Sequence, residues 1–269
     1  ILMAIGLLGI GFGFYTAPTD IKEVEALLAA DNHGGHAAVK HEAVDSHKAK
    51  ADSHVETLHD ATEAHEVDAH AEHEAHLTHL LHQLQNKPWA ALYVACIFFL
   101  LISMGTLAFY AIQQVAQAGW SPVLFRVMQG ITAYLPIGSI LFFVFLLLSG
   151  LHFNHLFVWL GEGVTDPNSS NYDQIIAGKA GYLNFPFWII RAAVFLLGWN
   201  LYRYYSRKNC LSQDEANDNF FYKKNFKMSA AFLVFFIVSE SIMSWDWIMS
   251  IDPHWFSTLF GWYVFASFF

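Results

Sequence analysis

The run WAALYVACIFFLLISMGTLAFYAIQ, residues 89–113, decides the fold class of this chain, because it contains no charged side chain. A helix needs about 20 mainly apolar residues to cross the hydrocarbon core of a bilayer. Three further runs meet this requirement: residues 127–151, 183–202 and 226–244. We therefore predict an all-α integral membrane protein whose centre is a transmembrane four-helix bundle within residues 89–252.

Shorter apolar runs lie at the two ends of the sequence. Residues 1–15 are too few to cross a bilayer, and residues 253–269 end in the apolar run FGWYVFASFF. We interpret the first run as part of a transmembrane helix and the second as the start of another. The four full spans are then flanked by two partial ones.

The net charge is confined to residues 16–88. This segment holds 14 acidic and 5 basic residues, a balance of 5 − 14 = −9 that equals the net charge of the whole chain. The other 196 residues hold 9 acidic and 9 basic side chains. An apolar body without net charge excludes a basic surface for nucleic acid. A hydrophobic content of 55% also excludes a disordered chain.

Residues 16–88 form a low-complexity insert rich in histidine and glutamate. It holds 12 of the 15 histidines, and His70, His73, His76 and His79 recur at every third position. Because residues three or four apart share one face of a helix, we predict a helix over 60–86. Two interpretations stay open: a zinc or copper site on these histidines, or a solvated acidic segment that binds metals only weakly. The second is favoured, since equivalent ligands in a repeat define no single geometry.

Two ionisable side chains lie inside the predicted spans at similar depth. Arg191 belongs to the run 183–202 and Glu240 to the run 226–244. Charged groups within a membrane are costly and usually face a bundle interior or water. We predict that Arg191 and Glu240 form a pair. The pair is either purely structural or part of a proton path or of a polar pocket beside a quinone.

More polar side chains follow the outer ends of the spans. They complete the candidates for a proton path or a quinone-adjacent pocket: His152, His155, Asp246, Asp252 and His254. Four tryptophans are expected to form an aromatic belt at the membrane surface: Trp245, Trp247, Trp255 and Trp262. Pro136 is expected to kink the span over 127–151, because proline removes a helical hydrogen bond.

The sequence has no motif for a redox centre of its own. It contains no CxxCH haem attachment, no cysteine run typical of an iron–sulfur cluster, and no histidine deep inside a predicted span. We therefore predict no catalytic residue and no covalently bound cofactor. Any redox role would depend on partner proteins or on a bound quinone.

Several motifs resemble a known family. The segment MSWDWIMSIDPHWFSTLFGWYVFAS, residues 243–267, is similar to the F subunit of alternative complex III. That complex is a bacterial quinol:cytochrome c oxidoreductase, and the subunit belongs to the NrfD/PsrC-like membrane proteins. GFYTAP (13–18), KPWAAL (87–92) and FNHLFVW (153–159) resemble the same subunit. The family fold has about ten spans in two four-helix bundles, so the resemblance implies that this chain is the first part of that fold.

The resemblance also implies a function and a set of partners. The chain would be a membrane subunit of a respiratory electron-transfer complex in the bacterial inner membrane, with residues 16–88 in the periplasm. Quinol oxidation would be carried out with an NrfD/PsrC-like C subunit, an iron–sulfur subunit, multihaem and monohaem cytochrome c subunits and a haem–copper oxidase. Those partners would hold the haem c and the iron–sulfur clusters. This chain would contact lipids and a quinone such as menaquinone, would not be catalytic alone, and is proposed to conduct protons.

Two functions of other classes stay open. Intramembrane Arg191 and Glu240 also suit a secondary transporter or channel, and the histidine repeat suits a metal-handling membrane protein. Copurified haem c and iron–sulfur partners would select the redox complex. Substrate uptake by the isolated chain would select the transporter, and tight stoichiometric zinc or copper would select the metal protein.

Lysine and arginine predict the topology. Six of them cluster between residues 203 and 227: Arg203, Arg207, Lys208, Lys223, Lys224 and Lys227. Because cytoplasmic segments carry an excess of these residues, we expect residues 204–225 inside the cell and residues 16–88 outside. Protease added to right-side-out vesicles should cut the insert and spare the basic segment. Cleavage near Lys223 with an intact insert would reverse this topology.

Overall fold

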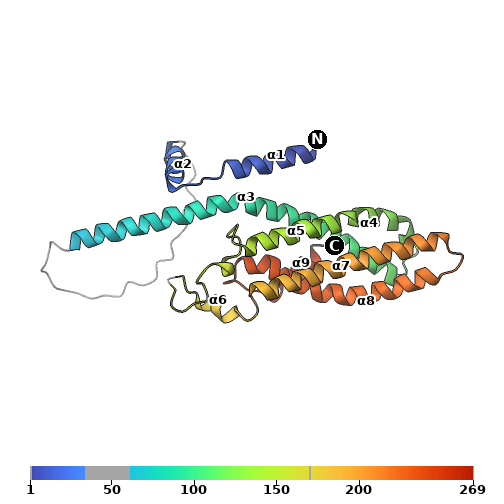
Figure 1. Cartoon of the computed structure of the whole chain (residues 1–269). Coiled ribbons are helices and arrows are strands. Elements are labelled where there is room, and N and C mark those ends of the chain that lie inside the picture. Colours follow the sequence, from blue (N-terminus) through green and yellow to red (C-terminus); the bar gives the residue numbers. More distant parts are fainter. Residues whose placement is uncertain (1, 34–60, 170, 269) are drawn as a thin grey trace. The chain divides into compact units, whose positions relative to one another are not determined.

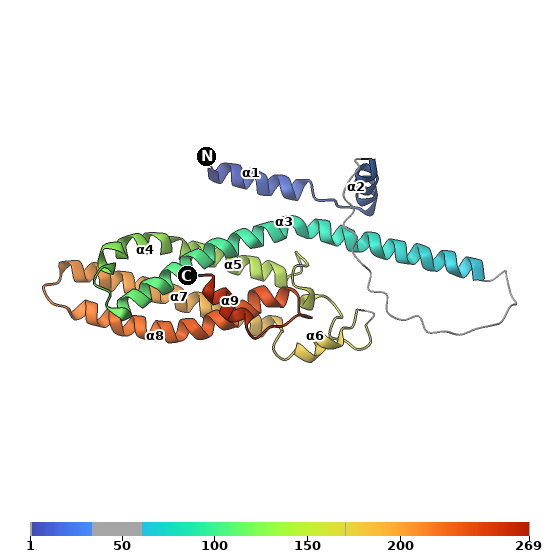
Figure 2. The same ribbon diagram turned by 180° about the vertical axis from the view of Figure 1, so that it is seen from behind.

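The computed structural model describes residues 2–33, 61–169 and 171–268, and the regular elements within these ranges are all helical (Figures 1 and 2). Within them, four helical segments are long and apolar enough to cross a membrane: Leu80–Ala116, Ser121–Gly150, Phe185–Glu215 and Phe220–Ile251. The chain is therefore a multi-pass α-helical membrane protein, and the predicted fold class is confirmed.

The chain divides into two compact units, Ile1–Pro88 and Trp89–Phe269. The first unit contains three helical segments: α1 (Leu2–Tyr15), α2 (Ile21–His33) and the N-terminal part of α3 (Ala61–Ala116). Within this unit, the side-chain amide of Gln85 donates a hydrogen bond to the carbonyl of Pro18 at 3.2 Å.

The helix α3 includes the histidine repeat and continues into the first predicted span. Its start at Ala61 confirms the helix predicted over 60–86. Pro88 lies inside α3 and does not end it. Apolar residues on its C-terminal side extend the helix as a membrane span.

The second unit is a helical bundle. Its elements follow in this order: the C-terminal part of α3, the 3₁₀ turn η1 (Ser121–Leu124), α4 (Phe125–Ile131), the 3₁₀ turn η2 (Thr132–Tyr134), α5 (Leu135–Gly150), the 3₁₀ turn η3 (Val158–Leu160), α6 (Gln174–Lys179), α7 (Phe185–Glu215), α8 (Phe220–Met243), the π turn η4 (Ser244–Ile248), the 3₁₀ turn η5 (Met249–Ile251) and α9 (Phe260–Ala266). The helices α7 and α8 lie side by side, and α5 packs against α7 (Figures 1 and 2).

Local sequence signals set two of the helix starts. Asn184 caps α7, where its side-chain oxygen accepts a hydrogen bond from the backbone N–H of Phe187 at 3.0 Å. The turn η2 comes just before Pro136, in the first turn of α5. The proline ring would collide with the helical carbonyl four residues earlier, that of Thr132. The 3₁₀ turn thus interrupts the α-helix just before Pro136.

Two helix boundaries differ from those predicted. The helix α7 continues to Glu215, and α8 begins at Phe220, so only residues 216–219 connect them. Lysine and arginine are good helix formers, and the helices therefore extend beyond the apolar runs. The span predicted over 226–244 continues through η4 and η5 to Ile251. Asp246 therefore lies inside a spanning segment, and not after it as the apolar run 226–244 predicts.

Aromatic side chains form much of the bundle core. The ring of Trp247 is fully buried, with its centroid 4.7 Å from that of Phe142 and 5.8 Å from that of Trp199. The hydroxyl of Tyr93 donates a hydrogen bond to the carbonyl of Trp247. Trp247 was expected in the surface belt, and this expectation is wrong. Trp245 is exposed because residues two apart point to different sides of a helix.

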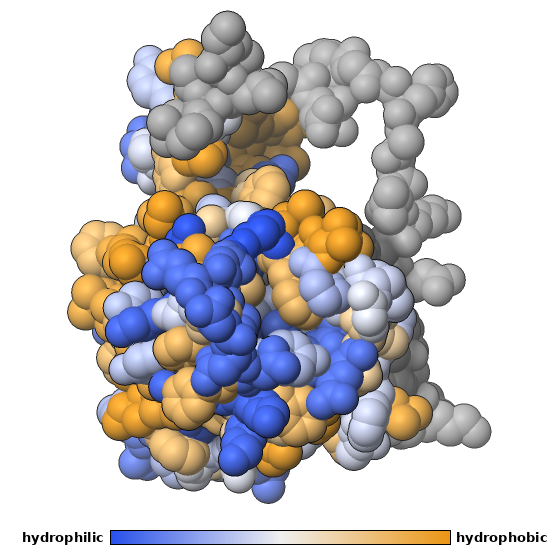
Figure 3. Space-filling model, turned by 90° about the vertical axis from the view of Figure 1, so that its right-hand side faces the viewer, coloured by the Kyte–Doolittle hydropathy of each residue, from blue (hydrophilic) through white to orange (hydrophobic). Residues whose placement is uncertain are grey.

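The outward faces of the bundle are apolar, as a hydrocarbon environment requires. Leu197 on α7 and Val234 on α8 expose 70% and 69% of their surface. Hydrophilic residues gather at the end of the bundle that Figure 3 faces. At the connection between α7 and α8, Arg207 and Lys223 are exposed. We call the end of the bundle where α7 connects to α8 the connection end. The opposite end carries α6, and we call it the α6 end.

Close packing at Gly150 provides a test of the bundle. A Cβ atom added to Gly150 would lie 1.8 Å from Cε2 of Phe185, which packs against the core. Gly150→Ala should lower the free energy of unfolding by about 1–3 kcal/mol, the usual cost of overpacking. Gly130→Ala is the control, because the space around Gly130 is open. Equal thermal stability of the two variants in detergent would contradict this packing.

Candidate functional site

Arg191 of α7 and Asp246 of η4 form a buried, bidentate ion pair. The Nε atom of Arg191 lies 2.6 Å from Oδ2 of Asp246, and Nη2 lies 2.9 Å from Oδ1. Arg191 is 8% exposed and Asp246 is fully buried. Two parallel hydrogen bonds are the strongest geometry between a guanidinium and a carboxylate. The predicted pairing of Arg191 with Glu240 is therefore wrong.

Neighbouring groups satisfy the other polar atoms of the pair. The hydroxyl of Tyr182 donates to Oδ1 of Asp246 at 2.7 Å. The backbone carbonyl of Asp246 accepts from Trp188 Nε1 at 2.9 Å and from Ser250 Oγ at 2.5 Å. Both Nη atoms of Arg191 donate to the carbonyl of Tyr182 at 3.3 Å. A buried ion pair is stable only when the remaining donors and acceptors of both groups also form hydrogen bonds, as they do here.

Two aromatic rings enclose the guanidinium. Its central carbon lies 4.0 Å from the ring centroid of Tyr182 and 4.2 Å from that of Phe187. Ring faces attract such a cation and shield it from lipid. Burial, and next the charge of Asp246, raise the pKa of Tyr182 above its ordinary value. The hydroxyl therefore stays protonated and donates to the carboxylate.

Three of the five side chains of the π turn η4 point into the interior of the bundle. Ser244, Asp246 and Trp247 are all buried there. A π turn adds a residue to the helical repeat and often occurs at functional sites. The turn thus brings a charged and a large aromatic side chain to the same buried side of the segment.

Glu240 lies one and a half turns before this pair. It is 1% exposed, and its Oε1 accepts no hydrogen bond from any described residue. It belongs to the inward stripe of α8, whose buried members share one side of the helix: Asn225, Ser229, Phe232, Phe236, Ser239, Glu240 and Met243. No ion pair to Glu240 occurs within the described ranges. Glu240 is therefore a buried carboxyl without a cationic partner there.

A second polar cluster lies toward the connection end, around Tyr110. The hydroxyl of Tyr110 contacts Gln114 Nε2 and Asn225 Nδ2 at 3.0 Å each, and Ser206 Oγ at 3.2 Å. The carbonyl oxygens of Gln114 and Asn225 are buried and accept no hydrogen bond from the described residues. A cavity of about 10 Å³ beside Tyr110 and Arg203 has room for about one water.

Aromatic rings separate this cluster from Glu240. Phe232 stacks on Tyr202 with ring centroids 3.9 Å apart, and Phe236 is 1% exposed. Both phenylalanines lie on α8 between Asn225 of the cluster and Glu240. Among the described residues, no side-chain hydrogen bond joins the Tyr110 cluster to the Arg191–Asp246 pair.

The other candidate residues lie at the surface of the α6 end. His254 Nε2 lies 2.6 Å from Oδ2 of Asp173, and Asp173 caps α6 through the N–H groups of Ile175 and Ile176. The hydrogen bond from His254, and next that from Ile176, hold the pKa of Asp173 below its ordinary value. Asp252 is exposed and accepts the backbone N–H of His254 at 3.2 Å.

The remaining candidate histidines are two after α5 and four in the repeat. His152 and His155 are exposed in the segment after α5. The side chains of the four repeat histidines lie outside the described part of the structure: His70, His73, His76 and His79. Elsewhere, the described residues contain no group of three His, Cys, Asp or Glu side chains that could hold a metal ion.

Sequence reasoning missed several partners of the site. Tyr182 and Trp188 carry no motif that links them to Asp246. The apolar residues on both sides of Asp246 were a usable signal, because the run IMSW–D–WIMSI continues the span. Asp173 before an apolar turn also fits a helix cap. The Tyr110 cluster had no such signal, since its members come from distant helices.

Comparison with known proteins does not assign the chain to a family. No protein-family model matches it, and a search of curated proteins finds no match.

Removing one charge of the ion pair should destabilise the bundle. Asp246→Asn leaves Arg191 buried without a counter-charge, which typically costs about 3–5 kcal/mol. We expect less folded chain in the membrane and a lower thermal midpoint in detergent. Replacing both partners, as Arg191→Met with Asp246→Leu, should recover part of this loss. The exposed Asp252→Asn is the control, and equal stability of Asp246→Asn and this control would contradict the role of the pair.

Proposed function

We propose that this chain is an integral membrane subunit of a quinol:cytochrome c oxidoreductase of the alternative complex III type. In that complex it supports quinol oxidation by partner subunits and conducts protons. The observation that carries the proton role is Glu240, a carboxyl that is buried inside a membrane span and forms no ion pair with any cation of the described residues. Membership of the complex rests on the resemblance of residues 243–267 and of three shorter motifs.

The proton role follows from the different surroundings of the two carboxyl groups. Asp246 is held by Arg191 and by Tyr182, so its charge is compensated. Glu240 lacks such compensation. Ionisable residues in this position commonly serve proton relays. In our proposal, Glu240 takes up and releases a proton while the ion pair stays intact.

The aromatic layer gives the proposed route a direction. Phe232 and Phe236 separate Glu240 from the Tyr110 cluster. Asp246 follows Glu240 by six positions, which is about 9 Å along a helix axis. In our proposal, Glu240 therefore exchanges protons with the α6 end, which the lysine and arginine pattern predicts to lie outside the cell.

Electron carriers belong to the partners in this proposal. Multihaem and monohaem cytochrome subunits hold haem c, and an iron–sulfur subunit holds the clusters. A related NrfD/PsrC-like C subunit adjoins the quinol, and a haem–copper oxidase receives the electrons. The complex lies in the bacterial inner membrane, with residues 16–88 in the periplasm.

A quinone ring in the middle of the groove between α5 and α7 would find no free N–H group on Asn200. The amide nitrogen of Asn200 donates to Ser139 Oγ at 2.8 Å and to the carbonyl of Leu196 at 2.7 Å. Both of its N–H groups are therefore engaged. This favours quinol oxidation in a partner subunit, where menaquinone or another quinone would bind.

The ion pair weighs against a secondary transporter. A transporter for an anionic substrate needs a cation that the substrate can reach. The Nε and both Nη atoms of Arg191 already donate to Asp246 or Tyr182. A cation engaged in this way is poorly suited to bind and release a substrate.

Glu240→Gln separates proton conduction from assembly. Glutamine keeps the shape of the side chain but cannot exchange the proton. Because Asp246 is the partner of Arg191, the variant should assemble and keep its thermal stability. Quinol turnover and coupled proton release should fall by about tenfold or more, since a positioned proton-transfer group contributes at least that much.

Asp252→Asn is the matched control, because it removes an exposed carboxyl at the same end. It should leave turnover and proton release unchanged. Unchanged proton release in an assembled Glu240→Gln complex would remove the proton role and leave the chain a scaffold. Extraction in mild detergent without haem c or iron–sulfur partners would contradict membership of the complex.

A further inference from the structure

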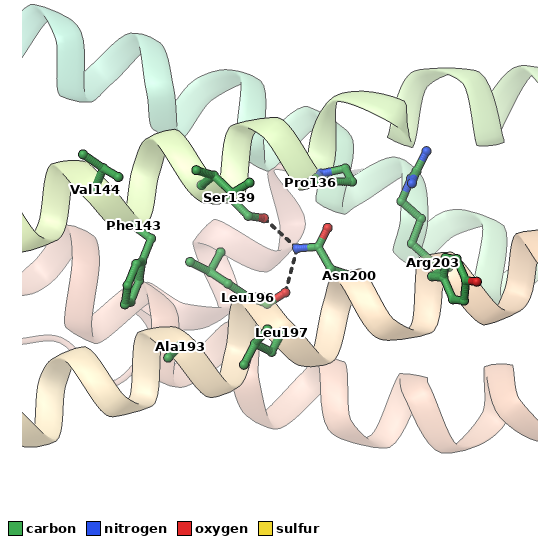
Figure 4. Close-up of a pocket in the computed structure, with 11 residues that line it drawn as sticks. Pro136, Ser139, Phe143, Val144, Ala193, Leu196, Leu197, Asn200 and Arg203 are labelled. Atoms are coloured by element: carbon green, nitrogen blue, oxygen red, sulfur yellow. Dashed lines mark hydrogen bonds between the residues drawn. The ribbon is translucent and has the colours of Figure 1, made fainter.

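A groove of about 500 Å³ opens between α5 and α7 (Figure 4). Apolar side chains of both helices line most of it, among them Ile140, Val144 and Leu197. Ile140 and Leu197 expose 66% and 70% of their surface. The groove is therefore open to the hydrocarbon that surrounds the bundle.

Positive charge lies at one end of the groove. Arg203 lines this end (Figure 4), and its Nε donates to Thr132 Oγ1 at 3.3 Å. Among the described residues, no carboxylate lies within ion-pair distance of Arg203. The next acidic residue along α7, Asp214, is paired with Arg126. The terminal nitrogens of Arg203 thus remain available to an anion.

The length of the groove matches one leaflet of a bilayer. Its lining follows α7 from Ala193 to Arg203, a rise of about 15 Å for ten residues. The hydrocarbon core of a bilayer is about 30 Å thick, so one leaflet measures about half of that. Tyr204 lies beside Arg203 and is exposed, as aromatic residues at the headgroup level often are.

In the middle of the groove, both N–H groups of Asn200 are engaged, while its Oδ1 is buried and accepts no hydrogen bond from the described residues. Figure 4 shows the amide of Asn200 turned toward Ser139, with which it forms the hydrogen bond described above. A ligand ring in the middle of the groove would find no free N–H group there. A ligand with apolar chains and an anionic end would match both the lining and Arg203.

We propose that this groove binds one anionic phospholipid of the surrounding membrane. An acyl chain lies along Ile140, Val144 and Leu197, and the phosphate accepts charge-assisted hydrogen bonds from Arg203. Basic residues between transmembrane helices recognise acidic headgroups in this way. The site lies on the outward face of α7 and is independent of the proposed proton role.

Native mass spectrometry of the complex in mild detergent tests the site. Dioleoyl phosphatidylglycerol and dioleoyl phosphatidylcholine are added separately, and bound lipid is counted per chain. We expect one phosphatidylglycerol site that binds about fivefold more tightly than phosphatidylcholine, as one cation near an anionic headgroup provides. Arg203→Gln should remove this preference, and Leu197→Trp should block the groove to both lipids.

Two variants serve as controls. Lys227→Gln removes an exposed cation from α8 near the same end, and Ile237→Trp enlarges an exposed side chain on the outer face of α8. Both should bind phosphatidylglycerol as the wild type does. The proposal is overturned if Arg203→Gln keeps the preference, if Leu197→Trp keeps the bound lipid, or if an added quinone displaces it. Absence of bound phosphatidylglycerol from the wild-type complex would also overturn it.

Discussion

A buried arginine inside a membrane must be paired, and Arg191 meets this requirement with Asp246. The pair joins the first turns of α7 to the π turn that follows α8. It orients Tyr182, and the carbonyl of Asp246 in turn orients Trp188. Because Arg191 pairs with Asp246, the buried carboxyl of Glu240 has no cation paired to it among the described residues. The stability of the bundle and the proposed proton chemistry thus both depend on the pairing of Arg191 with Asp246 rather than with Glu240.

Polar contacts between helices hold much of the remaining bundle. Trp199 Nε1 donates to Ser239 Oγ at 2.9 Å, and the hydroxyls of Tyr202 and Ser229 lie 2.7 Å apart. Lipid is as apolar as a leucine side chain, so burial of apolar surface contributes little to association of the helices. Close packing and hydrogen bonds must therefore provide the free energy of helix association. The cluster around Tyr110 serves the same purpose and leaves two acceptor oxygens for water.

The two faces of α7 serve different proposed roles. Arg191 points into the bundle, and Leu197, six residues later, is exposed on the outer face. The hydrogen bond between Asn200 and Ser139 lies at the base of the outer groove. It ties α7 to α5 whether or not a lipid is bound. The proposed proton role inside the bundle and the proposed lipid site outside it therefore use different faces of α7.

The sequence by itself determined the four spans, the helix through the histidine repeat and the break before Pro136. These features depend on the length of apolar runs and on local backbone chemistry. The sequence did not determine the partner of Arg191. The positions of side chains along their helices predict their depth in the membrane, but not which side chains of packed helices face each other. The π turn places Asp246 on the buried side of its segment and also buries Trp247. The Tyr110 cluster likewise joins residues from separate helices, and only tertiary packing brings them together.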